Sequence, residues 1–128
     1  KVTAYVPPEK ASMERVTAAL PDGYRAIIGS VGAAGYVPFE VVPAHLSKAV
    51  GIRAICQHVG IPLSYTVALG DSNNDVEAVA RAAVGISIGG VCDDLVAVAD
   101  IVAPAVGQGG LAWALAAAGL IDEAPTPA

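Results

Sequence analysis

From Ser47 onward, short apolar runs alternate with helix-like segments, and this alternation constrains the fold more than any other feature. The apolar runs are continuous, as in Tyr65–Leu69 and Val84–Ile88, which is typical of parallel strands covered by helices on both faces. We therefore expect an α/β fold with a parallel sheet over residues 47–121. Only about three parallel strands are expected, so one edge of the sheet should lack a neighbour.

The same patterns place the remaining elements. Residues 1–46 indicate strand, helix, strand and strand, and residues 122–128 form a Pro- and Ala-rich tail that we expect to fray. The expected elements are strands Val2–Val6, Tyr24–Ile28, Tyr36–Val42 and Asp100–Ala103, and helices Glu9–Leu20, Asn74–Ala83, Cys92–Val98 and Gly110–Ala118. A further helix begins after Ser47, with Ile52, Ile55, Cys56 and Val59 on its apolar face.

The composition excludes disorder and disfavours a polyanion-binding role. Hydrophobic residues make up 55% of the 128 positions, and the mean hydropathy is +0.60, unlike the composition of disordered chains. Seven Lys and Arg against twelve Asp and Glu give a net charge of −5, the wrong sign for a surface that holds nucleic acid. We expect no nucleic-acid partner.

No segment is expected to cross a membrane. The longest apolar stretch, residues 78–106, is interrupted by four charged residues, and the run at 111–121 is too short to span a bilayer. The chain opens on a strand-like segment without the pattern of a signal peptide. We therefore expect a cytoplasmic protein in which Cys56 and Cys92 are reduced packing thiols.

The strongest chemical signal is the run Gly-Asp-Ser-Asn-Asn-Asp at 70–75, which follows an apolar strand and opens a helix. Ligands of parallel α/β proteins bind at the carboxyl ends of the strands, and carboxylate and amide oxygens suit Mg²⁺. A structural interpretation stays open, because Asn73 or Asn74 can cap the helix and Asp75 suits its positive end. Asp71 precedes the cap and is the residue that capping explains least.

Lys48 is the second informative residue, because a cation in the first turn of a helix faces the positive end of the helix dipole. The placement makes sense if an anion, either a phosphate or a carboxylate cluster, occupies the same place. A solvated surface lysine is the alternative. The alternation of helices and strands would put Lys48 near the same end of the sheet as Asp71, which favours a functional interpretation of both.

The segment Gly85–Gly89 matches the Gly-x-Ser-x-Gly pattern of a nucleophile elbow. An elbow serine needs a sharp turn between a strand and a helix, whereas Ser87 lies between two isoleucines in an expected strand. We therefore do not expect Ser87 to be a nucleophile.

Taken in order, these segments resemble the C-terminal half of a haloacid dehalogenase superfamily phosphatase, most closely the Cof-like, type IIB branch. The similarity rests on Ser47-Lys48, Gly70–Asp75, Val84–Ile88, Ala99–Val102 and Gly109–Leu111. It implies that residues 47–121 form the C-terminal half of a Rossmann-like core. Residues 1–46 resemble, more loosely, the closing portion of an α/β cap.

The resemblance implies Mg²⁺-dependent hydrolysis of a small phosphorylated metabolite through an aspartyl-phosphate. Lys48 would match the motif III lysine, which neutralises the nucleophile and binds the phosphoryl oxygens. Asp71 would match the motif IV aspartate that holds Mg²⁺. Asp75 would support the metal through water or through the lysine, and Asn74 would help to fix the site and contact the substrate.

One departure from the family is large. Its nucleophile comes from an Asp-x-Asp motif on the first core strand, and no Asp-x-Asp occurs in these 128 residues. We therefore expect the chain to be inactive alone and to pair, through the open edge beside Tyr65–Leu69, with the missing N-terminal half or a second copy. The alternative is a non-catalytic remnant that binds an anion and a metal.

Overall fold

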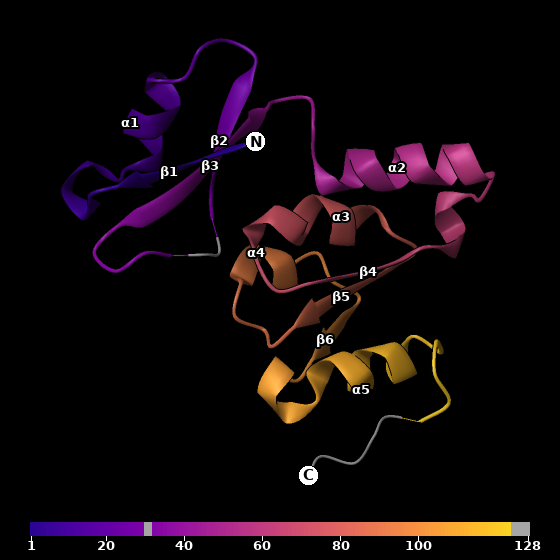
Figure 1. Ribbon diagram of the computed structural model, residues 1–128. Coiled ribbons are helices and arrows are strands. Elements are labelled where there is room, and N and C mark those ends of the chain that lie inside the picture. The colour runs from indigo at the N-terminus through magenta and orange to yellow at the C-terminus, as the bar shows by residue number, and fades with distance from the viewer. Residues whose placement is uncertain (30–31, 124–128) are drawn as a thin grey trace. The chain divides into compact units, whose positions relative to one another are not determined.

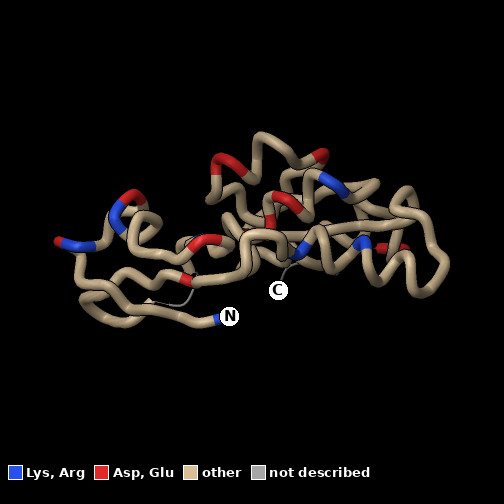
Figure 2. The backbone as a smooth tube through the Cα atoms, turned by 90° about the horizontal axis from the view of Figure 1, so that it is seen from above, with Lys and Arg blue, Asp and Glu red and all other residues tan. Residues whose placement is uncertain are grey.

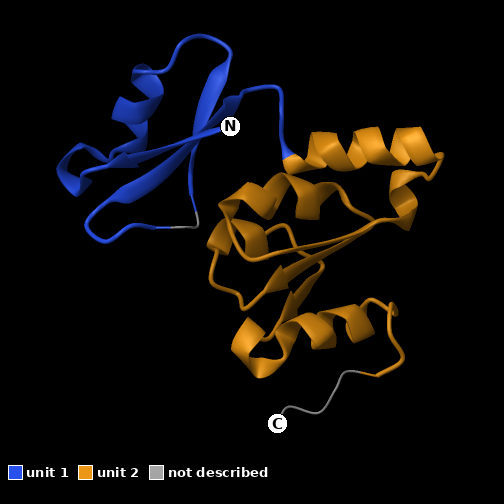
Figure 3. Cartoon of the chain, viewed as in Figure 1, with its two compact units in different colours: residues 1–47 blue, residues 48–128 orange. Residues whose placement is uncertain are grey.

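The described residues form two three-stranded sheets, one antiparallel and one parallel. The computed structural model describes residues 1–29 and 32–123 and divides into two units, residues 1–47 and 48–128 (Figure 3). The first unit contains β1 (Val2–Val6), the 3₁₀ turn η1 (Pro8–Lys10), α1 (Met13–Ala18), β2 (Tyr24–Ile28) and β3 (Val37–Pro43). The second contains α2 (Lys48–Val59), η2 (Leu63–Tyr65), β4 (Val67–Gly70), η3 (Asn73–Asp75), α3 (Val76–Arg81), β5 (Val84–Ile88), α4 (Asp93–Val96), β6 (Ile101–Ala103), η4 (Val106–Gln108) and α5 (Gly110–Ala117).

In the first unit, β3 is the central strand of an antiparallel sheet of order β1-β3-β2. Phe39 of β3 is 1% exposed and lies in register with Ala4 of β1 and Ile28 of β2. Side chains in register on neighbouring strands share one face of the sheet. Phe39 is therefore buried at the centre of this face, while Ile28 beside it is 47% exposed. Lys1 and Glu40 form an ion pair of 2.8 Å.

The expected single helix from Glu9 to Leu20 is wrong. A 3₁₀ turn ends at Lys10, and α1 begins at Met13, after Ser12. Ser12 has extended backbone angles, and its hydroxyl accepts a hydrogen bond of 3.1 Å from the Arg15 N–H. An N-cap serine satisfies an amide that the first helical turn leaves without a partner, and it therefore starts a new helix here.

Replacing Ser12 with Ala is expected to destabilise α1 by about 1 kcal/mol, because the Arg15 amide loses its acceptor. Amide hydrogen exchange across residues 13–18 should become faster, while exchange in β5 of the second unit stays unchanged. Ser12→Asn, which retains a capping oxygen, should leave the exchange of α1 close to that of the unmodified chain. Equal protection of α1 in the Ala and Asn variants would contradict the capping role.

In the second unit, β4, β5 and β6 form a parallel sheet in that order. Figure 1 shows helices on both of its faces, with α3 and α4 on one and α5 on the other. On the α3 face the core consists of Ala68, Ala78, Val79 and Leu95, and on the α5 face it consists of Ile86, Ile88, Ala103 and Ala114. The expected α/β fold with a doubly covered parallel sheet is confirmed, and within the described residues β4 is an edge strand.

Two local expectations in this unit need correction. Residues 63–65 form a 3₁₀ turn, so the strand expected from Tyr65 begins at Val67. In α2 the buried residues are Ala49 and Cys56, whereas Ile55 and Val59 are 65% and 54% exposed. The helix packs on α3 through the side of the helix that carries Ala49 and Cys56, and Ile55 and Val59 lie outside this contact.

The structure also describes the distribution of charge, the lengths of the helices and the state of the two cysteines. Figure 2 shows acidic and basic residues interspersed along both units. No helix among residues 1–29 and 32–123 is long and apolar enough to cross a membrane. Both cysteines are free, Cys56 buried and Cys92 partly buried. Most of the tail expected to fray, residues 124–128, lies outside the described residues.

Candidate active site

The candidate site is built on the turn that leaves β4 at its carboxyl end. Gly70 ends β4, and the 3₁₀ turn η3 leads from there into α3. A Cβ atom on Gly70 would lie 2.3 Å from the Cβ of Asp75 and 3.0 Å from its Oδ2 atom. The absence of a side chain at position 70 therefore lets the Asp75 carboxyl group fold back over the end of the strand.

Asp75 is the buried centre of this turn, with 7% of its surface exposed. Its Oδ1 atom accepts a bond of 2.5 Å from Lys48 Nζ. Its Oδ2 atom lies 3.3 Å from both the Asp71 N–H and the Ser72 hydroxyl. A buried carboxylate needs a charge partner and hydrogen-bond donors. Lys48 supplies the charge partner at Oδ1, and the turn supplies only long contacts at Oδ2.

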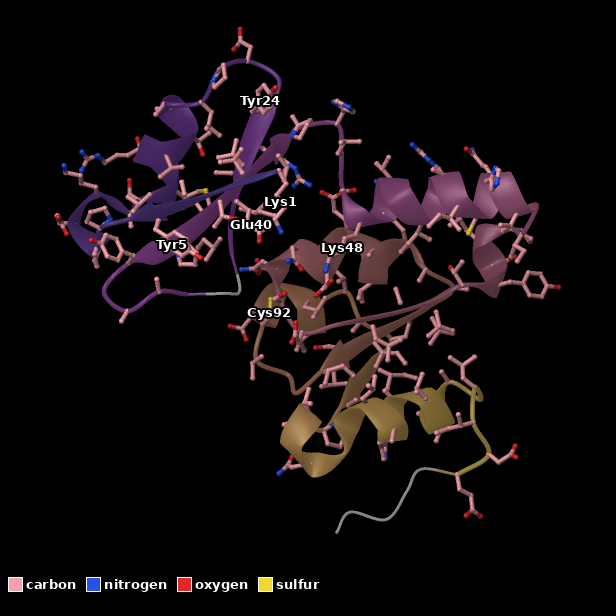
Figure 4. The ribbon with its side chains drawn as sticks, in the orientation of Figure 1. Lys1, Tyr5, Tyr24, Glu40, Lys48 and Cys92 are labelled. Carbon is pink, nitrogen blue, oxygen red and sulfur yellow. The ribbon has the colours of Figure 1, made fainter. Side chains whose placement is uncertain are left out.

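Lys48 reaches this turn from the first residue of α2, as Figure 4 shows. Its ammonium group also donates to Asn74 Oδ1 at 3.0 Å. The Lys48 side chain is 54% exposed, whereas that of Asp75 is 9% exposed. The lysine therefore lies between a buried carboxylate and solvent, and part of its charge remains available to a further anion. An anion was expected at this place, either a phosphate or a carboxylate cluster, and the structure places one carboxylate there, that of Asp75.

Asp71 occupies the exposed side of the turn. Within residues 1–29 and 32–123, its carboxylate makes no hydrogen bond or ion pair, and its backbone N–H points to Asp75. An exposed carboxylate next to a buried one is suited to a hard cation that approaches from solvent. Asp71 therefore has carboxylate oxygens that are free to bind a cation.

The oxygen atoms of this turn can supply some, but not all, of the ligands that Mg²⁺ requires. The described residues contain no group of three or more His, Cys, Asp or Glu that could hold a metal ion. Mg²⁺ commonly binds one or two carboxylates, retains several waters and takes further oxygens from a phosphate. Asp71, with Asp75 directly behind it, meets that requirement, while Asp75 is already engaged by Lys48.

Two contacts in the turn were missed by sequence reasoning. The Ser72 hydroxyl lies 3.1 Å from Asn74 Oδ1 as well as 3.3 Å from Asp75, and the Cys92 thiol donates to Asn73 Oδ1 at 3.0 Å. Cys92 directly precedes α4 (Figure 4). Ser72 belongs to the predicted motif, but nothing in the sequence indicates that Cys92 contacts it.

The structure thus brings Lys48, Asn74 and Asp75 into direct contact and places Asp71 beside them. Ser87 lies inside β5 and is 0% exposed, which agrees with the expectation that it is no elbow nucleophile. The model of the haloacid dehalogenase-like hydrolases matches residues 1–115. The chain belongs to this family.

Individual relatives agree with this membership. The haloacid dehalogenase-like chain is 30% identical over 82 residues to the putative phosphatase YkrA of Bacillus subtilis, covering 64% of the chain and 32% of YkrA. It superimposes on the subclass IIB sugar phosphatase BT4131 with a TM-score of 0.73 and 28% identity, covering 93% of the chain and 43% of that structure. The Cof-like, type IIB resemblance is confirmed.

A further match is to the chloroplastic endoribonuclease YBEY of Arabidopsis thaliana, with 32% identity over 76 residues, covering 59% of the chain and 13% of that protein. The haloacid dehalogenase-like chain therefore spans less than half the length of each of these three proteins.

Proposed function

We propose that this chain supplies the lysine and metal-binding half of a phosphomonoester hydrolase site. The observation that carries the proposal is the contact of Lys48 with Asp75 and Asn74 on the turn that follows β4, in a chain whose relatives include phosphatases. A small phosphorylated metabolite is the proposed substrate. Mg²⁺ is the proposed cofactor, with Asp71 as its main protein ligand.

Lys48 would act on the phosphoryl group as a fixed positive charge. Asp75 and Asn74 hold the ammonium group at the end of the sheet, while its exposed side faces the place where phosphoryl oxygens would lie. A charge that is positioned before the reaction stabilises the developing negative charge without reorganisation. Asn74, whose amide oxygen is bound to Lys48, has its NH₂ group left to contact substrate.

Mg²⁺, when bound, would neutralise phosphoryl oxygens and orient the phosphate for in-line attack. Asp71 would hold it through the free carboxylate, and Asp75 would keep the turn in shape from beneath through its bond to the Asp71 N–H. We assign metal binding to Asp71 and support of the turn to Asp75 because Asp71 is exposed and Asp75 is buried.

The attacking carboxylate would come from outside these 128 residues, because no Asp-x-Asp occurs in them. It would attack phosphorus, break the P–O bond to the substrate's alcohol, which leaves with a proton, and form an aspartyl-phosphate; water would then release inorganic phosphate and restore the carboxylate. We propose that another part of the protein, or another chain, brings this aspartate to the open edge of β4.

The test is phosphate release from small phosphomonoesters with Mg²⁺, combined with native mass spectrometry of the purified material. The chain alone should release no phosphate above background. A complex whose second component carries an Asp-x-Asp strand should release phosphate, and this release should disappear with Asp71→Ala. Robust turnover by the chain alone that Asp71→Ala abolishes would overturn the proposed division of the site.

Replacing Asp71 with Asn is expected to weaken Mg²⁺ binding at least tenfold, because an amide oxygen carries no charge to attract the cation. Isothermal titration of the chain with MgCl₂ measures the change directly. Asp22→Asn, which removes the same charge from an exposed position in the first unit, is the matched control and should bind Mg²⁺ like the unmodified chain. Equal affinities in all three proteins would exclude Asp71 as the ligand.

A non-catalytic binding module is the second candidate function, and the absence of Asp-x-Asp favours it. In this case the chain would bind Mg²⁺ and phosphate at Asp71 and Lys48, and no companion chain would confer turnover. Calorimetry with inorganic phosphate in the presence of Mg²⁺ tests this function. No heat of binding at millimolar concentrations would exclude it.

A further inference from the structure

Ser87 is a fully buried hydroxyl that the site described so far does not use. It is 0% exposed, and its Oγ atom has no hydrogen-bond partner within the described part of the chain. Buried hydroxyl groups are nearly always hydrogen-bonded, because an unsatisfied one retains the full cost of losing water. A serine in the centre of an apolar strand, between Ile86 and Ile88, therefore calls for a polar neighbour.

The sheet register places that neighbour. Ser87 of β5 is paired with Gly70 of β4, so both residues face the same side of the sheet, about 5 Å apart as neighbouring strands are. The space above Gly70 is filled by Asp75, whose Oδ2 atom lies 3.0 Å from the place of a Gly70 Cβ. Ser87 and the Asp75 carboxylate are therefore placed on the same side of the sheet, at neighbouring positions of β5 and β4.

Asp75 Oδ2 also lacks a good donor. Both of its contacts measure 3.3 Å, whereas hydroxyl-to-carboxylate hydrogen bonds are normally about 2.5–2.7 Å. Ser72 has a single hydroxyl proton and lies closer to Asn74 Oδ1, at 3.1 Å. When Ser72 donates to Asn74, the long bond from the Asp71 N–H is the one that Asp75 Oδ2 retains within the described residues.

We propose that Ser87 is a positioning residue whose hydroxyl donates to Asp75 Oδ2 and fixes the carboxylate from the sheet side. The proposed bond requires a rotation of one or both side chains, because the Ser87 Oγ atom has no hydrogen-bond partner in the described structure. Asp75 would then be held by Lys48 at one oxygen and by Ser87 at the other. The consequence for Mg²⁺ and phosphate rests on the proposed function, but the hydrogen bond itself does not.

The test is a double-mutant cycle with Ser87→Ala and Asp75→Ala in the 128-residue chain without metal. Urea unfolding followed by the fluorescence of Trp113, the single tryptophan and part of α5, reports on the second unit. We expect Ser87→Ala to lower the folding equilibrium constant about tenfold when Asp75 is present and by no more than about twofold when it is absent, since hydrogen bonds to charged groups are the strong ones.

Two further variants keep the cycle interpretable. Ser87→Cys preserves most of the volume but is a weak donor, and it replaces Ser87→Ala in the cycle if the latter does not fold. Thr66→Val removes a hydroxyl that already donates to the Leu63 carbonyl at 2.6 Å, at the far end of β4. We expect it to be destabilising but additive with Asp75→Ala.

Mg²⁺ titration of the same variants separates the two proposals. Ser87→Ala should bind Mg²⁺ about tenfold more weakly than the unmodified chain, because residues that orient a ligand contribute on this scale, whereas Thr66→Val should not change the affinity. Coupling in the cycle without any Mg²⁺ binding by the unmodified chain would uphold the hydrogen bond and reject the proposed function. Additivity of the two substitutions in the cycle, whatever the stability of Ser87→Ala itself, would overturn the positioning role of Ser87.

Discussion

Gly70→Ala is expected to lower the free energy of unfolding of the second unit by about 3 kcal/mol, the upper part of the range for overpacking in a core. The added Cβ would lie 2.3 Å from Asp75 Cβ and 2.7 Å from its Cγ, and the backbone fixes the position of an alanine Cβ, so the new methyl group cannot turn away. Asp75 would have to leave its position over the strand, and with it the bonds to Lys48 and Asp71. Urea unfolding followed by Trp113 fluorescence measures the loss.

Gly51→Ala is the matched control for this substitution. Gly51 lies in α2, and a Cβ added there has no atom within 4 Å apart from its chain neighbours and the nearby backbone of the same helix. Alanine is the better helix former, so this variant should be more stable than the unmodified chain by about 0.5–1 kcal/mol. The same substitution of glycine by alanine is thus expected to lower the free energy of unfolding at position 70 and to raise it at position 51. A Gly70→Ala chain as stable as the unmodified one would show that Asp75 does not lie over Gly70 in solution.

Lys48→Met is expected to have the largest effect on catalysis. In an assembly that contains the nucleophile, kcat should fall about 10²–10³-fold, the usual loss when one preorganised group at the developing charge is removed. The chain alone should also lose about 1–2 kcal/mol of stability, because Asp75, with its side chain 9% exposed, loses its cation. The exposure of the lysine itself keeps this loss below that of a fully buried pair.

Arg53→Met removes the same charge from the same helix at an exposed position. It should leave both the stability of the second unit and the rate of phosphate release close to those of the unmodified protein. Comparing the two variants separates the contact of Lys48 with Asp75 from the general effect of making an acidic chain more acidic. If both variants lost activity equally, net charge rather than the position of Lys48 would explain the loss.

Much of the second unit could be predicted from the sequence because its signals are local and repeated. Continuous apolar runs gave the strand Val84–Ile88 with its observed bounds. The expectation that Lys48 and the 70–75 turn meet at one end of the sheet is also confirmed. It follows from topology, since the ends of parallel strands share an edge. The division of residues 1–47 from 48–128 is observed, while their roles as cap and core stay predictions.

What could not be predicted depends on single atoms rather than on patterns. The helix expected from Glu9 is interrupted because one hydroxyl, that of Ser12, satisfies one amide, and hydrophobic periodicity does not register such a bond. Likewise, the contact of Cys92 with Asn73 joins residues 19 positions apart. Ser87 was expected in a strand between two isoleucines, but the lack of a partner for its hydroxyl within the described residues depends on individual side-chain positions that no sequence pattern indicates.

The position of β4 at one side of its sheet gives the amide groups of this strand two very different exchange environments. Amides that donate to β5 lie inside the ladder, whereas those directed away from β5 have no strand beside them within the described residues. Deuterium uptake in the chain alone should therefore be fast on one side of β4 and slow throughout β5. A segment that adds a strand beside β4 would slow exchange at the amides directed away from β5 and leave the others unchanged. Deuterium uptake in β4 therefore reports whether another strand has completed the sheet.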